Sequence, residues 1–205
     1  MNGLLEGLSF DIWPIGIVFL IIPLVVLWRR KSSFSYILCF TIFGIYLLRA
    51  AQEVYFPIEI NGFYADDMRQ EPFMSQVNLI PFSYGEFGTL ETTAVTLMQN
   101  ILLTIPFGFG INFIARTRAK TFRWLAPAVG FGTELGQLAI SLMLGYLYRL
   151  IDINDVLMNT LGVVVGYGLF RAFAWGYVWM TRRFGIEHRG LSAYVYEVAS
   201  DHRSP

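Results

Sequence analysis

Apolar residues follow one another along the chain in five long stretches, interrupted by short polar segments. The stretches cover residues 12–28, 34–56, 94–115, 122–144 and 155–180. Each comes close to the roughly 20 residues that a helix needs to cross about 30 Å of hydrocarbon. The pattern predicts an all-α integral membrane protein, with a bundle of five transmembrane helices in a single domain, residues 1–180, and a tail at residues 181–205.

The composition supports this interpretation, because 55% apolar and only 15% charged residues lie outside the usual mix of soluble domains. The first stretch could be a signal peptide, but Glu6 and Asp11 precede it without a basic residue, and no small-residue cleavage site follows. We therefore expect this helix to be retained. Cys39 is the single cysteine, which excludes a disulfide framework and a cysteine metal site. We expect no cofactor, no metal ion and no nucleic-acid partner.

Basic residues indicate which side of the membrane faces the cytoplasm. They cluster at residues 29–31, at residues 116–123 and in the tail after the last helix. The long second loop, residues 57–93, has only Arg69 against six acidic residues. With five helices, every basic cluster falls on one side. We therefore expect a multi-pass protein of the cell membrane, with its amino terminus outside and its carboxyl terminus in the cytoplasm.

Polar residues recur at helical spacing on three of the predicted helices. The three stripes are Thr93, Thr96, Asn100 and Thr104; Gly130, Glu134, Gln137 and Ser141; and Asp152, Asp155, Asn159, Gly162 and Gly166. With a rise of about 1.5 Å per residue, Glu134 lies about 18 Å from the cytoplasmic end of its helix, and Asn100 about 9 Å from the outer end. The stripes therefore predict a shared polar interior in the outer half of the membrane.

Glu134 is the residue that packing alone explains least well. A charge near the bilayer centre costs at least about 2.5 kcal/mol, so this side chain should face the protein interior and have a partner. One interpretation is a structural clamp with Gln137 and Asn100, and the other is a functional site.

The start of the last helix allows a similar choice. Asp155 can be an anionic group stabilised by the helix dipole, with Asp152 or Asn154 as the cap. This interpretation explains one carboxylate, but not two together with Arg149.

Two residue pairs have simpler explanations. Gly162 and Gly166 form a small-xxx-small pair typical of close helix packing, either within the chain or in a homodimer. Arg49 and Glu53, one helical turn apart, can pair with each other.

The second loop contains VNLIPFSYGEFGTL, residues Val77 to Leu90. This segment mixes apolar residues with Asn78, Pro81 and two glycines, so it is not expected to form a regular transmembrane helix. A re-entrant or interfacial segment that caps the outer end of the bundle is the alternative, because irregular backbone is tolerated where protein or water covers it.

Four motifs, in this order, resemble the VanZ-like family of small bacterial membrane proteins. They are NLIPF (78–82), NILLTIPFGF (100–109), ELGQ (134–137) and R-x-x-D-x-x-D-x-x-x-N-T-x-G (149–162). The resemblance covers roughly residues 35–175. It implies a link to low-level glycopeptide resistance in Gram-positive bacteria, against teicoplanin more than vancomycin.

The resemblance implies no biochemical activity, so the motif positions are candidate site residues without catalytic roles. These candidates are Asn78, Asn100, Glu134, Gln137, Arg149, Asp152, Asp155 and Asn159.

Three functions are open. A binding protein would hold the head group of a membrane lipid, a lipid-linked envelope component or a lipoglycopeptide antibiotic in an outward-facing polar site. An enzyme would modify a lipid-linked envelope precursor with Glu134 as acid or base, beside Asp155 and Arg149. A lipid transporter or flippase would use Glu134 as a proton site, although no inverted repeat is evident.

Overall fold

The computed structural model describes residues 9–60, 63–83 and 90–201, and within them the chain is almost entirely helical. The five main helices are α1 (Trp13–Arg29), α2 (Phe34–Tyr55), α4 (Leu90–Gly110), α6 (Ala119–Leu144) and α7 (Ile153–Phe184). The all-α prediction is confirmed. Each main helix covers most of one predicted apolar stretch.

Short elements connect and extend these helices. They are β1 (Ser9–Phe10), β2 (Ile58–Glu59), α3 (Phe63–Met68), the 3-10 helix η1 (Phe73–Gln76), β3 (Val77–Asn78), α5 (Asn112–Ala115), β4 (Ile151–Asp152) and α8 (Leu191–Asp201). β1 pairs antiparallel with β2, and β3 pairs parallel with β4. The third predicted helix therefore ends at Gly110 and resumes as α5, and the last one continues four residues further than predicted.

Among the described residues, three helical spans are long and apolar enough to cross a membrane: Phe34–Tyr55, Thr93–Ala115 and Ile153–Phe184. α1 is apolar but has only 17 residues. α6 has 26 residues, but Lys120, Arg123 and Glu134 lower its hydropathy. The chain is therefore compatible with a membrane, and the first and fourth predicted spans, α1 and α6, stay a prediction.

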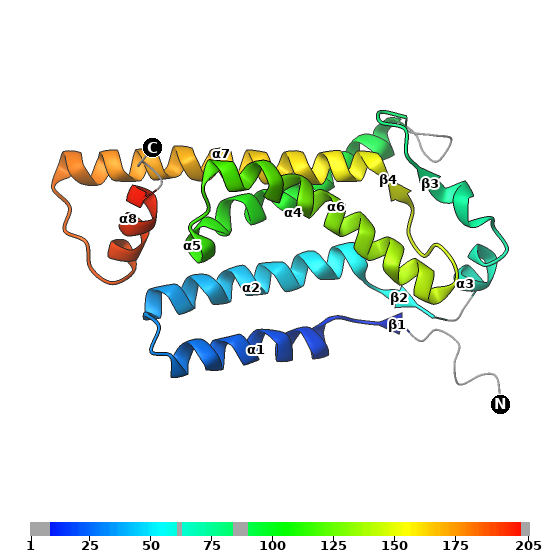
Figure 1. Cartoon of the computed structure of the whole chain (residues 1–205), viewed down its shortest axis with the longest axis horizontal. Coiled ribbons are helices and arrows are strands. Elements are labelled where there is room, and N and C mark those ends of the chain that lie inside the picture. Colours follow the sequence, from blue (N-terminus) through cyan, green and yellow to red (C-terminus); the bar gives the residue numbers. More distant parts are fainter. Residues whose placement is uncertain (1–8, 61–62, 84–89, 202–205) are drawn as a thin grey trace.

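α7 runs along one side of the molecule, and α4 and α6 pack against it (Figure 1). A methyl group at Gly108 would lie 2.1 Å from the Val163 carbonyl oxygen, and one at Gly166 would lie 2.0 Å from that of Ile105. At Gly162 it would meet the Thr104 hydroxyl and the Ile101 carbonyl, so α4 and α7 touch through their backbones. The predicted close packing at the Gly162 and Gly166 face is confirmed, and it lies within the chain.

The polar stripes can be compared with burial along each helix. On α6 all four stripe residues are buried, as are Asn159 and both glycines on α7. On α4, Thr104 is buried and Asn100 half-buried, whereas Thr96 is exposed. The stripe prediction is therefore confirmed for α6 and for most of α7, and only in part for α4.

α1 and α2 form a second layer (Figure 1). Gly16 and Gly44 leave room for Leu48 and Leu20 of the facing helix. α2 reaches α4 through the Tyr46 hydroxyl, which donates to the Leu103 carbonyl oxygen at 2.7 Å.

The predicted ion pair on α2 is confirmed. Arg49 Nη2 lies 2.8 Å from Glu53 Oε1, and the two side chains are 62% and 52% exposed.

The tail folds back as α8, a helix that was not predicted. Val198 and Ala199 are fully buried against Phe170, Ala174 and Val178 of α7. The Tyr194 hydroxyl donates to the Phe113 carbonyl, and Arg116 pairs with Glu197. α8 therefore packs against α7 and α5 at the end of the molecule opposite β3 and β4 (Figure 1).

Candidate functional site

The candidate residues come from five segments of the chain that meet where β3 and β4 join the bundle. Asn78 lies in β3, Asn100 in α4, Glu134 and Gln137 in α6, Arg149 and Asp152 in the segment that leads into α7, and Asp155 and Asn159 in α7. We call seven of the polar residues at this end the polar cluster: Asn78, Asn100, Glu134, Asp152, Asn154, Asp155 and Asn159.

Asp152 caps α7 and ties it to β3. Its Oδ1 accepts hydrogen bonds from the Asn154 backbone N–H at 2.8 Å and from Asn78 Nδ2 at 3.1 Å. The parallel pairing of β3 with β4 places Asn78 opposite Asp152. The predicted cap is therefore confirmed at Asp152, since its side-chain oxygen satisfies a free N–H of the first helical turn.

The sequence predicts Asn154 only as an alternative cap of α7, whereas in the structure its side chain binds the backbone of the segment after β3. Its Oδ1 accepts from the Phe82 N–H at 2.7 Å, and its Nδ2 donates to the Ser83 carbonyl at 3.1 Å. Asn78 Nδ2 donates to the same carbonyl at 2.6 Å. The two amides thus fix the segment after β3 on the first turn of α7. The available signal in the sequence was an asparagine between two aspartates at the start of a predicted helix.

Asp155 joins α7 to α4. Asn100 Nδ2 donates to its Oδ1 at 2.5 Å, and four residues along α4 the Thr104 hydroxyl donates to the Asn159 carbonyl at 2.9 Å. These bonds lie beside the glycine contacts that bring the two backbones together.

Glu134 faces the interior of the bundle, as predicted, and is only 5% exposed. Its Oε2 accepts from the Asp152 backbone N–H at 3.2 Å, and the carboxyl group interacts electrostatically with Asp155 and Asp152. The amides proposed to clamp Glu134 bind elsewhere: Asn100 donates to Asp155, and Gln137 donates to the Val54 carbonyl at 3.1 Å.

Gln137 and Arg149 bind backbone carbonyls at the end of α2, and not the carboxyl groups of the polar cluster. Arg149 Nη2 donates to the Phe56 carbonyl at 2.9 Å, next to the Val54 carbonyl that Gln137 binds. The guanidinium carbon of Arg149 lies 6.0 Å from the centroid of the Tyr148 ring. These two candidates therefore position α2 beside the polar cluster, and we leave them out of it.

Two buried polar atoms near the cluster have no hydrogen-bond partner among the described residues: Asn159 Oδ1 and the Tyr148 hydroxyl. Buried polar groups in proteins are nearly always bonded to protein, water or a ligand. Asn159 Nδ2 does have a partner, the Thr133 hydroxyl at 3.2 Å. Burial raises the pKa of Tyr148 to about 12, partly offset by the positive charge of Arg149, so its hydroxyl stays protonated at neutral pH.

In the part of the chain that the structure describes, no three His, Cys, Asp or Glu side chains are grouped as they would be to hold a metal ion. Glu134, Asn154 and Asn159 are buried, whereas Asn78, Asn100, Asp152 and Asp155 are half-buried. Three carboxyl groups and an unpaired amide oxygen make the cluster chiefly an acceptor of hydrogen bonds. It is suited to a group that carries several N–H or O–H donors or a positive charge.

The predicted outer segment at residues 77–90 is described only in part. β3 is followed by a hydrogen-bonded turn in which the Ser83 N–H donates to the Ile80 carbonyl at 3.2 Å. Residues 84–89 lie outside the described residues, so the re-entrant path predicted there is not tested.

One of three comparisons with known proteins, the comparison with family models, agrees with the motifs. Neither a curated protein nor a solved structure matches the chain. A family model described as VanZ/LLP1 matches residues 43–174. The match extends from the middle of α2 to the middle of α7 and contains every residue of the polar cluster. Since it covers well over half of the sequence, the chain belongs to the VanZ/LLP1 family.

Proposed function

We propose that the polar cluster binds the donor-rich head group of a lipid-tailed molecule at the outer side of the cell membrane. The ligand is a lipid-linked envelope component or a lipoglycopeptide antibiotic, and binding contributes to resistance of the teicoplanin type. The observation that carries this proposal is the burial of Glu134 beside Asp155 and Asp152. Grouped carboxyl groups repel one another when ionised, and a bound cationic or N–H-rich group would relieve that repulsion.

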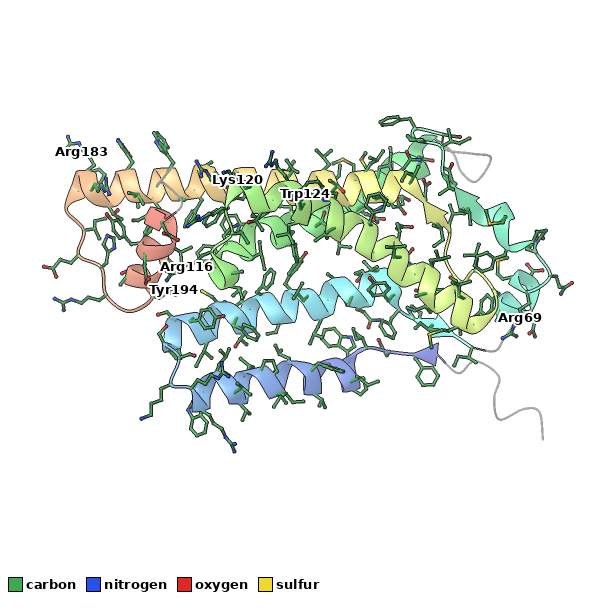
Figure 2. The ribbon with its side chains drawn as sticks, viewed as in Figure 1. Arg69, Arg116, Lys120, Trp124, Arg183 and Tyr194 are labelled. Atoms are coloured by element: carbon green, nitrogen blue, oxygen red, sulfur yellow. The ribbon has the colours of Figure 1, made fainter. Side chains whose placement is uncertain are left out.

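The proposal includes five membrane spans, namely α1, α2, the α4–α5 pair, α6 and α7, with the amino terminus outside. The arrangement of the basic residues supports it. The α1–α2 connection, the start of α6 and the end of α7 lie at one end of the molecule (Figure 1). Arg116 and Arg183 lie toward that end, and Arg69 at the opposite one (Figure 2). An excess of basic residues on one side is typical of the cytoplasmic face.

The lipid tail gives a physical reason for selectivity. The exposed side chains of α4 and α7 include Met98, Leu102, Leu161 and Val164, which are large and apolar. A ligand whose head reaches the polar cluster can therefore keep its tail among lipid chains along these helices. A glycopeptide without a tail lacks that contribution, which is about 0.8 kcal/mol for each buried methylene.

The test is paired susceptibility to teicoplanin and vancomycin in a sensitive Gram-positive host, at matched membrane levels. Glu134→Gln and Asp155→Asn keep side-chain size and remove the acid. Asp67→Asn is the matched control, since Asp67 is an exposed acid in α3 outside the cluster. We expect teicoplanin protection to fall in both cluster variants and to persist in the control. Full protection by both cluster variants would rule out the polar cluster as the site.

A second candidate function is acid–base catalysis on a lipid-linked precursor. It is favoured by one observation, the proximity of the Glu134 and Asp155 carboxyl groups, which can serve as a proton donor and acceptor pair. Purified protein in vesicles with a lipid-linked envelope precursor distinguishes the two. A change in precursor mass that Glu134→Gln abolishes supports an enzyme, whereas saturable binding with unchanged mass supports a binding protein.

A further inference from the structure

The turn after β3 displays large apolar side chains at the surface. Leu79, Ile80 and Phe82 are 64%, 67% and 67% exposed, and Pro81 between them is exposed as well. We call residues 79–82 the anchor turn. Apolar patches of this kind on a protein surface mark a membrane or a protein partner.

The backbone of the anchor turn is held in place by polar bonds. The Ile80 N–H donates to Asn78 Oδ1 at 3.2 Å, and the Phe82 N–H donates to Asn154 Oδ1 at 2.7 Å. Phe82 has a φ of 59°, a left-handed conformation that is unfavourable for a bulky residue. The Asn78 and Asn154 amides therefore fix a turn whose large apolar side chains are exposed, which is costly in water and favourable in lipid.

The position of the turn indicates lipid. β3 pairs with β4, and β4 leads directly into α7, a helix long and apolar enough to span a membrane. The turn is therefore level with the end of a spanning helix. No charged residue occurs in segment 77–83, whereas Asp66, Asp67 and Arg69 of the same loop are exposed.

The first turns of α4 expose apolar side chains as well. Val95 and Met98 on the first turns of α4 are exposed, and α4 reaches α7 beside them through Asn100 and Asp155. A protein partner would have to cover this surface as well as the turn, whereas lipid covers both without a further binding site.

We propose that the anchor turn inserts into the head-group and upper acyl region of the bilayer on the side of β3 and β4. Aromatic and aliphatic side chains partition into this region, and apolar faces enter it by about 5 to 10 Å. Because Asn78 and Asn154 connect the turn to Asp152, insertion holds the polar cluster at the depth of the lipid head groups.

The test is a depth measurement by spin labelling, which reads membrane position and not resistance. In a Cys39→Ser background, Leu79→Cys and Ile80→Cys are labelled with a nitroxide in phosphatidylcholine and phosphatidylglycerol vesicles. Collision with oxygen is compared with collision with a water-soluble nickel complex. Leu102→Cys, exposed on α4, is the lipid reference, and Asp67→Cys is the aqueous reference.

We expect oxygen to dominate over nickel at both turn positions, as at Leu102, and the reverse at Asp67. Two results would overturn the proposal. Nickel accessibility at Leu79 and Ile80 equal to that at Asp67 would place the turn in water. An immobilised label protected from both reagents would mean that protein, and not lipid, covers the turn.

Discussion

Asn100 on α4 donates a hydrogen bond to the carboxyl group of Asp155 on α7, with 2.5 Å between Nδ2 and Oδ1. This bond joins two helices at positions 55 residues apart, beside the Thr104 bond to the Asn159 carbonyl. Both residues belong to the polar cluster, and they lie on the two helices whose backbones touch at Gly162 and Gly166. This one hydrogen bond is therefore part of the candidate site and also part of the packing of α4 on α7.

Removing the Asn100 amide tests the energetic value of this bond. We expect Asn100→Ala to destabilise the protein by about 1 to 3 kcal/mol, because it leaves the half-buried Asp155 carboxyl group without its donor. The measurement is reversible unfolding in detergent, arranged as a double-mutant cycle with Asp155→Asn. The loss should be smaller in the Asp155→Asn background, and strictly additive losses would show that the two side chains do not interact.

The glycines of α7 offer a matched pair of substitutions. Gly166→Ala would place a methyl group 2.0 Å from the Ile105 carbonyl oxygen, whereas nothing lies within 4 Å of such a group at Gly168. We expect Gly166→Ala to force α4 and α7 apart and to cost about 1 to 3 kcal/mol, as overpacking does. Gly168→Ala should stabilise by about 0.5 to 1 kcal/mol, since alanine is favoured over glycine within a helix.

Thermal unfolding of the two variants in the same detergent measures the difference. Equal melting temperatures would mean that α4 and α7 do not approach closely at Gly166. A loss confined to Gly168→Ala would place the packed face of α7 on the other side of the helix.

The sequence predicted the helices better than their connections. Apolar length alone located the main helices, and helical spacing placed Glu134 and Asn159 on buried faces, because both patterns are local. The pairing of β3 with β4 joins Asn78 to Asp152 across 74 positions, and two-residue strands leave no periodic pattern. The docking of α8 also depends on contacts between distant segments.

The residues of the candidate site were likewise predicted better than the contacts that they make. The motifs specified every member of the polar cluster except Asn154, which falls on an unspecified position of the fourth motif. The partners of Gln137 and Arg149 could not be predicted from side-chain patterns. Both donate to backbone carbonyls at the end of α2, and a carbonyl group is present at every position of a chain. Tyr148 was missed for a related reason, since a lone tyrosine before Arg149 has no distinctive spacing.

Tyr148 allows a prediction about alkaline pH. Its pKa is raised from 10.0 to about 12 in the folded protein, because burial disfavours the phenolate. A group whose pKa is higher in the folded than in the unfolded protein contributes stability at pH values below its unfolded pKa. This contribution is lost as the pH rises from about 10 toward 12. We expect Tyr148→Phe to lose less stability than the wild type over that range.

At neutral pH, Tyr148→Phe also distinguishes an effect on protein stability from an effect on ligand binding. The hydroxyl lies beside the Arg149 guanidinium without a regular hydrogen bond, so removing it should change the free energy of unfolding by less than about 1 kcal/mol. If the hydroxyl contacts the ligand, teicoplanin protection falls although the protein is as stable as the wild type. Unfolding curves at pH 7 and above pH 10, together with susceptibility, measure both effects.

The docking of α8 gives the last prediction. Val198 is fully buried against Phe170, Ala174 and Val178, whereas Arg116 and Glu197 form an ion pair between largely exposed side chains. Burial of a valine stabilises by about 1.5 to 3 kcal/mol, and a surface ion pair by about 0 to 1 kcal/mol. We therefore expect Val198→Asp to release α8 from α7, and Glu197→Gln to leave it docked.

Amide hydrogen exchange in detergent measures α8 separately from the rest of the molecule. Val198→Asp should speed exchange along Leu191–Asp201 and leave the amides around Asn100 and Asp155 protected, because these lie at the opposite end of α7. Faster exchange in both regions would mean that α8 supports the whole bundle. Unchanged exchange in α8 would contradict the packing of Val198, and faster exchange in Glu197→Gln would show that the ion pair holds the helix instead.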